Sequence, residues 1–217
     1  RIESHELYFT HITQSTNNFE LFYSKINDKL IEKVHLFKFN SSASKKFFYC
    51  ECINGAILND LILNRKIKLS FEAKITLIFK LIIEIGYFHL NKIYFLKLHP
   101  SDFYIEKETQ NPFLINFDNF TENSENFVQN DNDDLSFSSP EQYIQGLYSN
   151  KSYIYSISRI IFFIMKEKQI TFRENGKLPD EYDFLNKVIE KCRKNNPNER
   201  PSIYNVIHSI FRGVNTN

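Results

Sequence analysis

Apolar and polar residues alternate in the first part of the chain, as they do in short strands. Residues 5–13 alternate over a whole segment, which predicts a strand. Residues 33–40 and 45–53 predict two more strands on either side of a serine-rich turn. Between the first and second of these strands, residues 19–26 have helical spacing and follow a run of residue types that begin helices. The N-terminal part is therefore predicted to combine three strands with one helix.

The rest of the chain has the spacing of helices. Residues 71–92 are apolar at nearly all positions around a helix, which Ser70 can cap, so we expect this helix to be buried on most faces. Further helices are predicted at 56–64, 156–165, 183–194 and 203–212. Residues 93–120 predict loop, short strands and turn, and the polar, acidic residues 121–134 predict a solvated loop. The whole pattern predicts an α+β fold with a small strand-rich lobe and a larger helical lobe.

Composition and charge restrict the class of protein. The chain has 217 residues, enough for one large domain or two small lobes, and a formal net charge of +1. It has no basic stripe with interleaved aromatic residues, which argues against a nucleic-acid partner. No apolar run reaches the ~18 residues of a membrane span, which argues against a membrane partner. Because the chain begins with Arg1, we expect it to be a segment of a longer protein.

The cysteines favour a reducing compartment. Cys50, Cys52 and Cys192 are too few for a disulfide framework. Cys50 and Cys52 lie in a strand-like run and should point to opposite faces, so buried thiols are a simpler interpretation than metal chelation. Since the sequence also has no signal peptide, we expect a cytoplasmic protein.

Five short motifs carry information about a family. They are CECINGAIL (50–58), GYFHLNKIYFLKLHPSD (86–102), FLINFD (113–118), SPE (139–141) and NPNERPS (196–202). They resemble, in order, the hinge, the catalytic loop, the Asp-Phe-Gly motif, the Ala-Pro-Glu motif and the Pro-x-x-Arg-Pro signature of protein kinases. Each motif alone is weak, whereas five in this order and at these intervals are specific.

The resemblance covers about residues 17–212 and implies a protein kinase-like bilobal fold. Residues 1–54 would form a partial N-lobe of strand, helix, two strands and hinge, and residues 55–217 a mainly helical C-lobe. No glycine precedes Gly55, so the N-lobe lacks the Gly-rich loop of the family unless that part lies upstream.

Four residues stand at structural positions of the family. The resemblance implies a buried ion pair between Glu141 and Arg200, which would be bidentate. Loss of one partner of such a pair leaves a buried charge and is strongly destabilising. Phe95 and Phe117 stand where the family packs a histidine and a phenylalanine, and we expect them to stack into the column that links the two lobes.

The charged catalytic positions carry other residue types. The resemblance places Lys97 at the catalytic base and His99 at the lysine that follows it, with Leu96 at the arginine before the base. An ammonium group with a reference pKa of ~10.4 cannot accept a hydroxyl proton at neutral pH. Residues 1–24 contain no lysine, so the strand lysine that would hold the phosphates is missing as well. We expect truncation of Lys97 to be nearly neutral for folding, as for a loop side chain.

Two metal-binding positions of the family are exchanged. Asp102 stands at the asparagine position and Asn116 at the position of the metal-binding aspartate. Asp102 can hold a cation weakly, since Mg²⁺ accepts one or two carboxylates together with waters. Alternatively, Asp102 pairs with Lys97 and binds no metal. We expect no cofactor. Weak binding of ATP or Mg²⁺ is the open alternative, because the hinge backbone around Glu51 and Cys52 can still hold adenine.

Three further positions depart from the family or have lost a partner. Glu20 fits the helix glutamate, but without its lysine it can equally be a solvated carboxylate at a helix start. Asp118 replaces the glycine of the Asp-Phe-Gly motif. Tyr153 replaces an aspartate that binds the backbone of the catalytic loop.

These substitutions together predict a pseudokinase, a catalytically inactive domain that acts as a protein-binding or allosteric module. A divergent active kinase is the first alternative, using Asp102 with Asp118 as a displaced base. The others are a nucleotide sensor that binds ATP without transfer and a remnant with a structural role only. We expect a protein partner, whose identity the sequence does not give.

Overall fold

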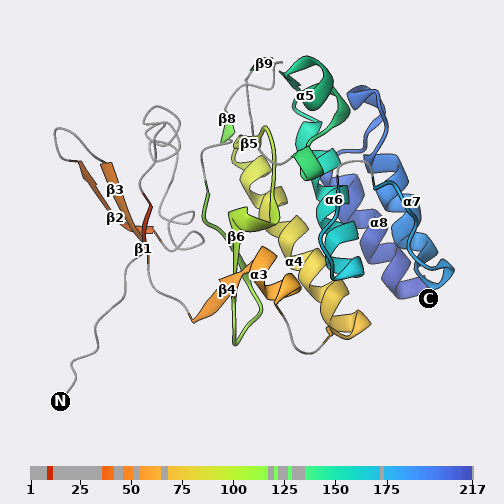
Figure 1. Ribbon diagram of the computed structural model, residues 1–217, viewed down its shortest axis with the longest axis horizontal. Coiled ribbons are helices and arrows are strands. Elements are labelled where there is room, and N and C mark those ends of the chain that lie inside the picture. The colour runs from red at the N-terminus through yellow and green to blue at the C-terminus, as the bar shows by residue number, and fades with distance from the viewer. Residues whose placement is uncertain are drawn as a thin grey trace.

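A computed structural model of the chain has an α+β fold in which helices predominate. It describes residues 9–11, 36–41, 46–50, 54–64, 68–116, 120–121, 127–128, 135–171 and 174–216. Figure 1 shows the long helices lying side by side, with short strands along one edge of this layer.

A three-stranded antiparallel sheet holds the described residues before position 54. Its strands are β1 (Phe9–His11), β2 (Leu36–Ser41) and β3 (Lys46–Cys50). Strand β3 lies in the middle and pairs with both of the others. The three strands predicted from the sequence are confirmed, whereas the helix predicted at 19–26 lies outside the described residues.

The helical part begins with a strand that the sequence pattern did not predict. Strand β4 (Gly55–Ile57) runs directly into helix α3 (Leu58–Leu63), so the helix predicted at 56–64 begins two residues later. Strand β4 pairs with β6 (Phe103–Glu106), which also pairs with β7 (Pro112–Leu114). This sheet fixes the segment that carries the candidate site.

The long predicted helix is α4 (Phe71–Leu90). Ser70 caps it, since its hydroxyl accepts a hydrogen bond from the amide of Ala73 at 3.2 Å. Its inner side is buried in the core. Its outer side is not covered by the described residues, because Ile83 is exposed and Leu90 is 66% exposed. The expectation that this helix is buried on most faces is confirmed apart from this outer side.

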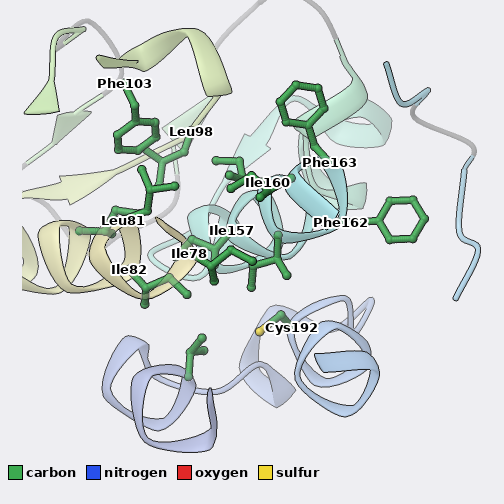
Figure 2. Packing of buried hydrophobic residues seen from close by; sticks show 14 of the residues in the cluster. Ile78, Leu81, Ile82, Leu98, Phe103, Ile157, Ile160, Phe162, Phe163 and Cys192 are labelled. Carbon is green, nitrogen blue, oxygen red and sulfur yellow. The ribbon is translucent and has the colours of Figure 1, made fainter. Parts of the chain in front are cut away.

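Helix α6 (Ser152–Lys166) is the centre of the helical part. All of its residues except Lys166 are buried, and it begins four residues before the range predicted from the sequence. In Figure 2, Ile157 and Ile160 of this helix lie beside Ile78 and Leu81 of α4. Apolar side chains from the two helices therefore form a common core.

Three more helices complete the described structure: α5 (Pro140–Gln145), α7 (Asp183–Cys192) and α8 (Ile203–Thr216). The last two were predicted from their amphipathic spacing, and α5 was not. Short 3-10 turns occupy Pro100–Asp102, Leu135–Phe137, Asp180–Tyr182 and Pro197–Glu199. Among the described residues, no helix has the length and apolar character needed to cross a membrane.

Two short strand pairs enter the segment expected to be a solvated loop. Strand β5 (Tyr94–Phe95) pairs with β8 (Phe120–Thr121), and β9 (Phe127–Val128) pairs with β10 (Leu147–Tyr148). The prediction of a solvated loop at 121–134 is therefore wrong at Thr121 and at Phe127–Val128, and the other residues of this range lie outside the described residues. Alternation over two residues is too short to reveal such strands in the sequence.

Gly55 is required by the close approach of β4 to β6. A Cβ atom at this position would lie 2.1 Å from the carbonyl oxygen of Ile105. We expect Gly55→Ala to lower the free energy of unfolding by about 1–3 kcal/mol, as overpacking does. Gly176→Ala is the matched control, because its Cβ would lie 3.7 Å from the Phe162 ring, an ordinary contact. Urea unfolding measures both, and equal midpoints for the two variants would contradict this assignment.

Candidate functional site

The segment that resembles a catalytic loop is a buried turn between β5 and β6. Lys97 is 4% exposed, and Leu96 and Leu98 are buried on either side of it. The expectation that Lys97 is a loop side chain of no importance for folding is therefore corrected. The stem of a lysine packs like an apolar side chain, so its truncation removes contacts.

Both carboxylate oxygens of Asp102 accept hydrogen bonds close to the turn. The backbone amide of His99 donates to Oδ2 at 2.6 Å, and Nδ2 of Asn116 donates to Oδ1 at 2.9 Å. The side chain of Asp102 is buried, with 5% of the residue exposed. Its backbone carbonyl accepts from the amide of Ile115 at 2.8 Å. The structure thus brings the two residues of the exchanged pair into direct contact, and the carboxylate caps the turn.

His99 caps the same turn and packs against the helical core. The amide of Ser101 donates to Nδ1 of His99 at 3.1 Å. The imidazole ring lies edge-to-face on Phe137, with the ring centroids 4.6 Å apart, and Phe137 in turn meets Phe163 of α6. The histidine at the predicted lysine position therefore makes packing contacts, which stabilise the turn.

The turn is also held by α5. Nε2 of Gln142 donates to the carbonyl oxygen of Leu96 at 2.8 Å, and its Oε1 accepts from the amide of Ser139 at 2.6 Å.

Tyr153, predicted at the aspartate position, places its hydroxyl 3.1 Å from Nδ1 of His89. Burial raises the pKa of the Tyr153 hydroxyl, so this group stays neutral.

Metal binding at this turn would have to compete with existing hydrogen bonds. A cation on Asp102 would take lone pairs that now accept from His99 and Asn116. Over the part of the chain that the structure describes, no three His, Cys, Asp or Glu side chains gather as a metal site. The alternative pairing of Asp102 with Lys97 stays a prediction.

Several predicted site residues lie outside the described residues. These are Glu51 and Cys52 of the hinge, Phe117, and the two carboxylates Glu20 and Asp118. The hinge site for adenine and the column through Phe117 therefore stay predictions.

Phe95, the other member of that column, is buried. Its ring packs edge-to-face against Phe88 of α4, with the centroids 5.6 Å apart. Aromatic pairs of this geometry add to the stabilisation from burial alone. Phe95 therefore fixes the start of the turn to the long helix.

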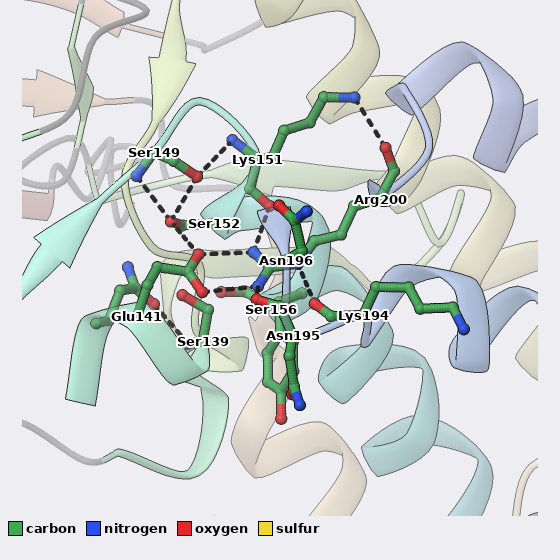
Figure 3. Close-up of polar contacts among 12 residues, drawn as sticks. Ser139, Glu141, Ser149, Lys151, Ser152, Ser156, Lys194, Asn195, Asn196 and Arg200 are labelled. Atoms are coloured by element: carbon green, nitrogen blue, oxygen red, sulfur yellow. Dashed lines mark hydrogen bonds and ion pairs between the residues drawn. The ribbon is translucent and has the colours of Figure 1, made fainter. Parts of the chain in front are cut away.

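The contact predicted between Glu141 and Arg200 is present (Figure 3). Nη1 of the arginine donates to Oε1 of the glutamate at 2.6 Å, and Nη2 donates to Oε2 at 2.7 Å. The guanidinium is buried, so this bidentate pair lies in a medium of low dielectric constant.

Arg200 has an acceptor for each of its five N–H donors. Besides the two bonds to Glu141, it donates to the carbonyl oxygens of Lys194, Lys151 and Asn195 at 2.8, 3.1 and 3.3 Å. The hydroxyl of Ser152 donates to Oε1 of Glu141 at 2.8 Å. One guanidinium therefore joins α5, the start of α6 and the segment between α7 and α8.

The arginine also sets the protonation of the glutamate. Burial alone would raise the pKa of the Glu141 carboxyl, but the hydrogen bonds and the charge of Arg200 outweigh it. The pKa of Glu141 therefore lies below its usual value, and the carboxylate stays charged at neutral pH.

Comparison with known proteins does not assign the chain to a family. No protein-family model matches it, and no curated protein matches it significantly. The resemblance to protein kinases therefore rests on the motifs of the sequence.

Helix α5 and Gln142 were missed in the sequence, although a signal for them exists. Ser139 and Gln142 have the spacing of a capping box, and the amide of Ser139 donates to Oε1 of Gln142 at 2.6 Å. Pro140 stands at the first helical position, where proline is favoured. This pattern is sufficient to predict a helix that begins at Pro140.

Removal of the buried guanidinium should be strongly destabilising. We expect Arg200→Ala to lower the free energy of unfolding by about 3–5 kcal/mol, because Glu141 would remain as a buried charge. Lys187→Ala breaks an exposed ion pair with Asp183, 2.7 Å long, and should change it by less than about 1 kcal/mol. Urea unfolding compares the two, and similar losses would show that the Arg200 network contributes no more than a surface pair.

The low pKa of Glu141 predicts how stability depends on pH. A carboxyl whose pKa is lower in the folded state contributes stability above its unfolded pKa, about 4.3, and loses it as pH falls through the folded pKa. The stability difference between the wild type and Glu141→Gln should be constant above about pH 5 and shrink below about pH 4. Unfolding in urea from pH 3 to pH 7 measures it, and a difference that grows on acidification would contradict the assignment.

Proposed function

We propose that this chain is a catalytically inactive protein kinase-like domain that acts as a protein-binding or allosteric module. In this proposal, residues 1–54 are a partial N-lobe and residues 55–217 are a helical C-lobe. The five motifs in the order and spacing of protein kinases support the family, and the geometry of the turn at 95–102 supports the loss of catalysis.

The hydrogen bonding of Asp102 carries the proposal. Its buried carboxylate accepts from the amide of His99 and from the side chain of Asn116. A carboxylate that holds Mg²⁺ needs oxygen lone pairs directed at the ion and room for the waters that Mg²⁺ keeps. The one acidic side chain left at the former metal positions is therefore a structural cap.

The position of the catalytic base supports the same conclusion. Phosphoryl transfer depends on positioning, on charge stabilisation and on a residue that accepts the proton of the hydroxyl group. Lys97 at this position is buried, and an ammonium group cannot accept a proton. Restoring an aspartate at this position alone would leave the metal and phosphate groups unsupported.

The retained framework supports a role that needs a folded domain. The Glu141–Arg200 pair and the buried helix α6 stabilise the helical part. This stabilisation does not depend on the residues at the predicted catalytic positions. A chain that keeps its framework while the chemistry is lost is suited to binding other proteins.

Phosphate transfer tests the proposal directly. We expect no transfer of radiolabelled phosphate from ATP to generic protein substrates or to the chain itself, with Mg²⁺ or with Mn²⁺. Loss of the base alone is worth about 10²–10⁴ in rate, and the other groups act with it as a unit.

A blank without protein and the variant Asp102→Asn are the controls, and circular dichroism checks that the variant is folded. Transfer by the wild type that Asp102→Asn abolishes would show an active enzyme and refute the proposal. Thermal unfolding with ATP separates a nucleotide sensor from a protein-binding module, because a bound ligand raises stability by RT ln(1 + [L]/Kd). We expect no rise in the midpoint.

A further inference from the structure

A pocket with a volume of about 510 Å³ lies between α5, α6, α7 and the loop that contains Lys177. None of the residues predicted as a site from the sequence lines it. Four cationic side chains line it: Lys177, Lys187, Arg193 and Lys194. The carboxylates of Asp183 and Glu190 also line it, and Asp183 already pairs with Lys187. The pocket is therefore positively charged on balance.

Arg193 in the wall of this pocket differs from Arg200, seven residues further on. Its Nε and Nη2 atoms are buried and have no hydrogen-bond acceptor. Its guanidinium lies over the ring of Phe162, 4.8 Å from the centroid, and Figure 2 shows this ring pointing away from the Ile and Leu side chains shared by α4 and α6. Buried N–H groups without acceptors are costly and rare in folded proteins.

A fully buried cation nearby makes the environment of the half-buried Arg193 less favourable still. Arg159 of α6 is fully buried and donates to the carbonyl oxygens of Ser136, Thr171 and Glu174. Burial and then the charge of Arg159 lower the pKa of Arg193 to about 10. An anion in the pocket would supply acceptors and relieve this repulsion.

The surface around the pocket is suited to a protein segment. Lys177 and Lys194 are exposed, and neither pairs with a carboxylate in the described part of the chain. Tyr143 and Pro140 of α5 form an apolar side of the pocket. Ile144, which follows Tyr143 in the chain, is 67% exposed. Exposed apolar residues beside a charged pocket are typical of a site for another macromolecule.

We propose that this pocket binds an acidic segment of a partner protein, with an Asp or Glu carboxylate of that segment paired with Arg193. The planar guanidinium matches a carboxylate bidentately, and an apolar side chain next to that carboxylate packs on Tyr143 and Pro140. The guanidinium turns away from Phe162 to reach the carboxylate, which exchanges a weak cation–π contact for a charge-assisted pair. The inference rests on the proposed function only in that the partner is a protein.

Fluorescence anisotropy with a labelled nine-residue peptide of glutamates around a central phenylalanine tests binding. We expect the wild type to bind this peptide, and Arg193→Met to weaken binding at least about tenfold, the effect of losing one charge-assisted pair. Lys194→Ala should weaken it about two- to fivefold because Lys194 lines the pocket. Lys191→Ala is the matched control, since Lys191 is an exposed lysine of the same segment that does not line the pocket.

Urea unfolding of Arg193→Met separates a binding role from a structural one. Because the variant removes buried donors that have no acceptor, its unfolding midpoint should equal or exceed that of the wild type. A lower midpoint would show that Arg193 serves the fold and would overturn the proposal.

Three binding results would also overturn it. They are equal binding of a peptide with glutamine in place of glutamate, unchanged binding by Arg193→Met, and binding of a phosphoserine peptide but not of the glutamate peptide. Asp102→Asn should bind the glutamate peptide as the wild type does. The peptide assay can therefore refute this proposal without refuting the proposed function, and the phosphate-transfer assay can do the reverse.

Discussion

The guanidinium of Arg200 is the constraint on which the helical part of this protein depends. Its five N–H donors reach the carboxylate of Glu141, the carbonyl oxygen of Lys151 just before α6, and two carbonyl oxygens just after α7. A buried charge without such partners is costly, so α5, the start of α6 and the segment before α8 are held in one arrangement. That arrangement brings Gln142 of α5 to the backbone of Leu96 and so fixes the turn at 95–102.

The hydrogen bonding of buried polar atoms distinguishes Asp102 from Arg193. Asp102 is satisfied by His99 and Asn116, which assigns this candidate site residue to the fold. Arg193 is buried at Nε and Nη2 without an acceptor, which points to a ligand that is absent from the free protein. We therefore propose a structural role for the turn at 95–102, and the proposed binding site lies in a segment that no motif marks.

Periodicity in the sequence was sufficient for the large elements and insufficient for contacts between them. The helices at 183–192 and 203–216 follow from amphipathic spacing, and the helix at 71–90 follows from a long run that is apolar at nearly all positions. The burial of Lys97 could not be predicted, since a polar residue in a loop-like sequence is normally exposed. The contact between Asp102 and Asn116 joins residues fourteen apart, and only the pairing of β6 with β7 brings them together.

Paramagnetic broadening by Mn²⁺ tests most directly whether Asp102 is a structural cap. In an NMR spectrum of the chain with Mn²⁺ and ATP, we expect the amide signals of His99, Asp102 and Asn116 to keep their intensity. Their signals should be no weaker than those of residues beside an exposed carboxylate such as Glu190. Selective loss of these three signals, abolished by Asp102→Asn, would show that the carboxylate holds a metal ion and would contradict the account.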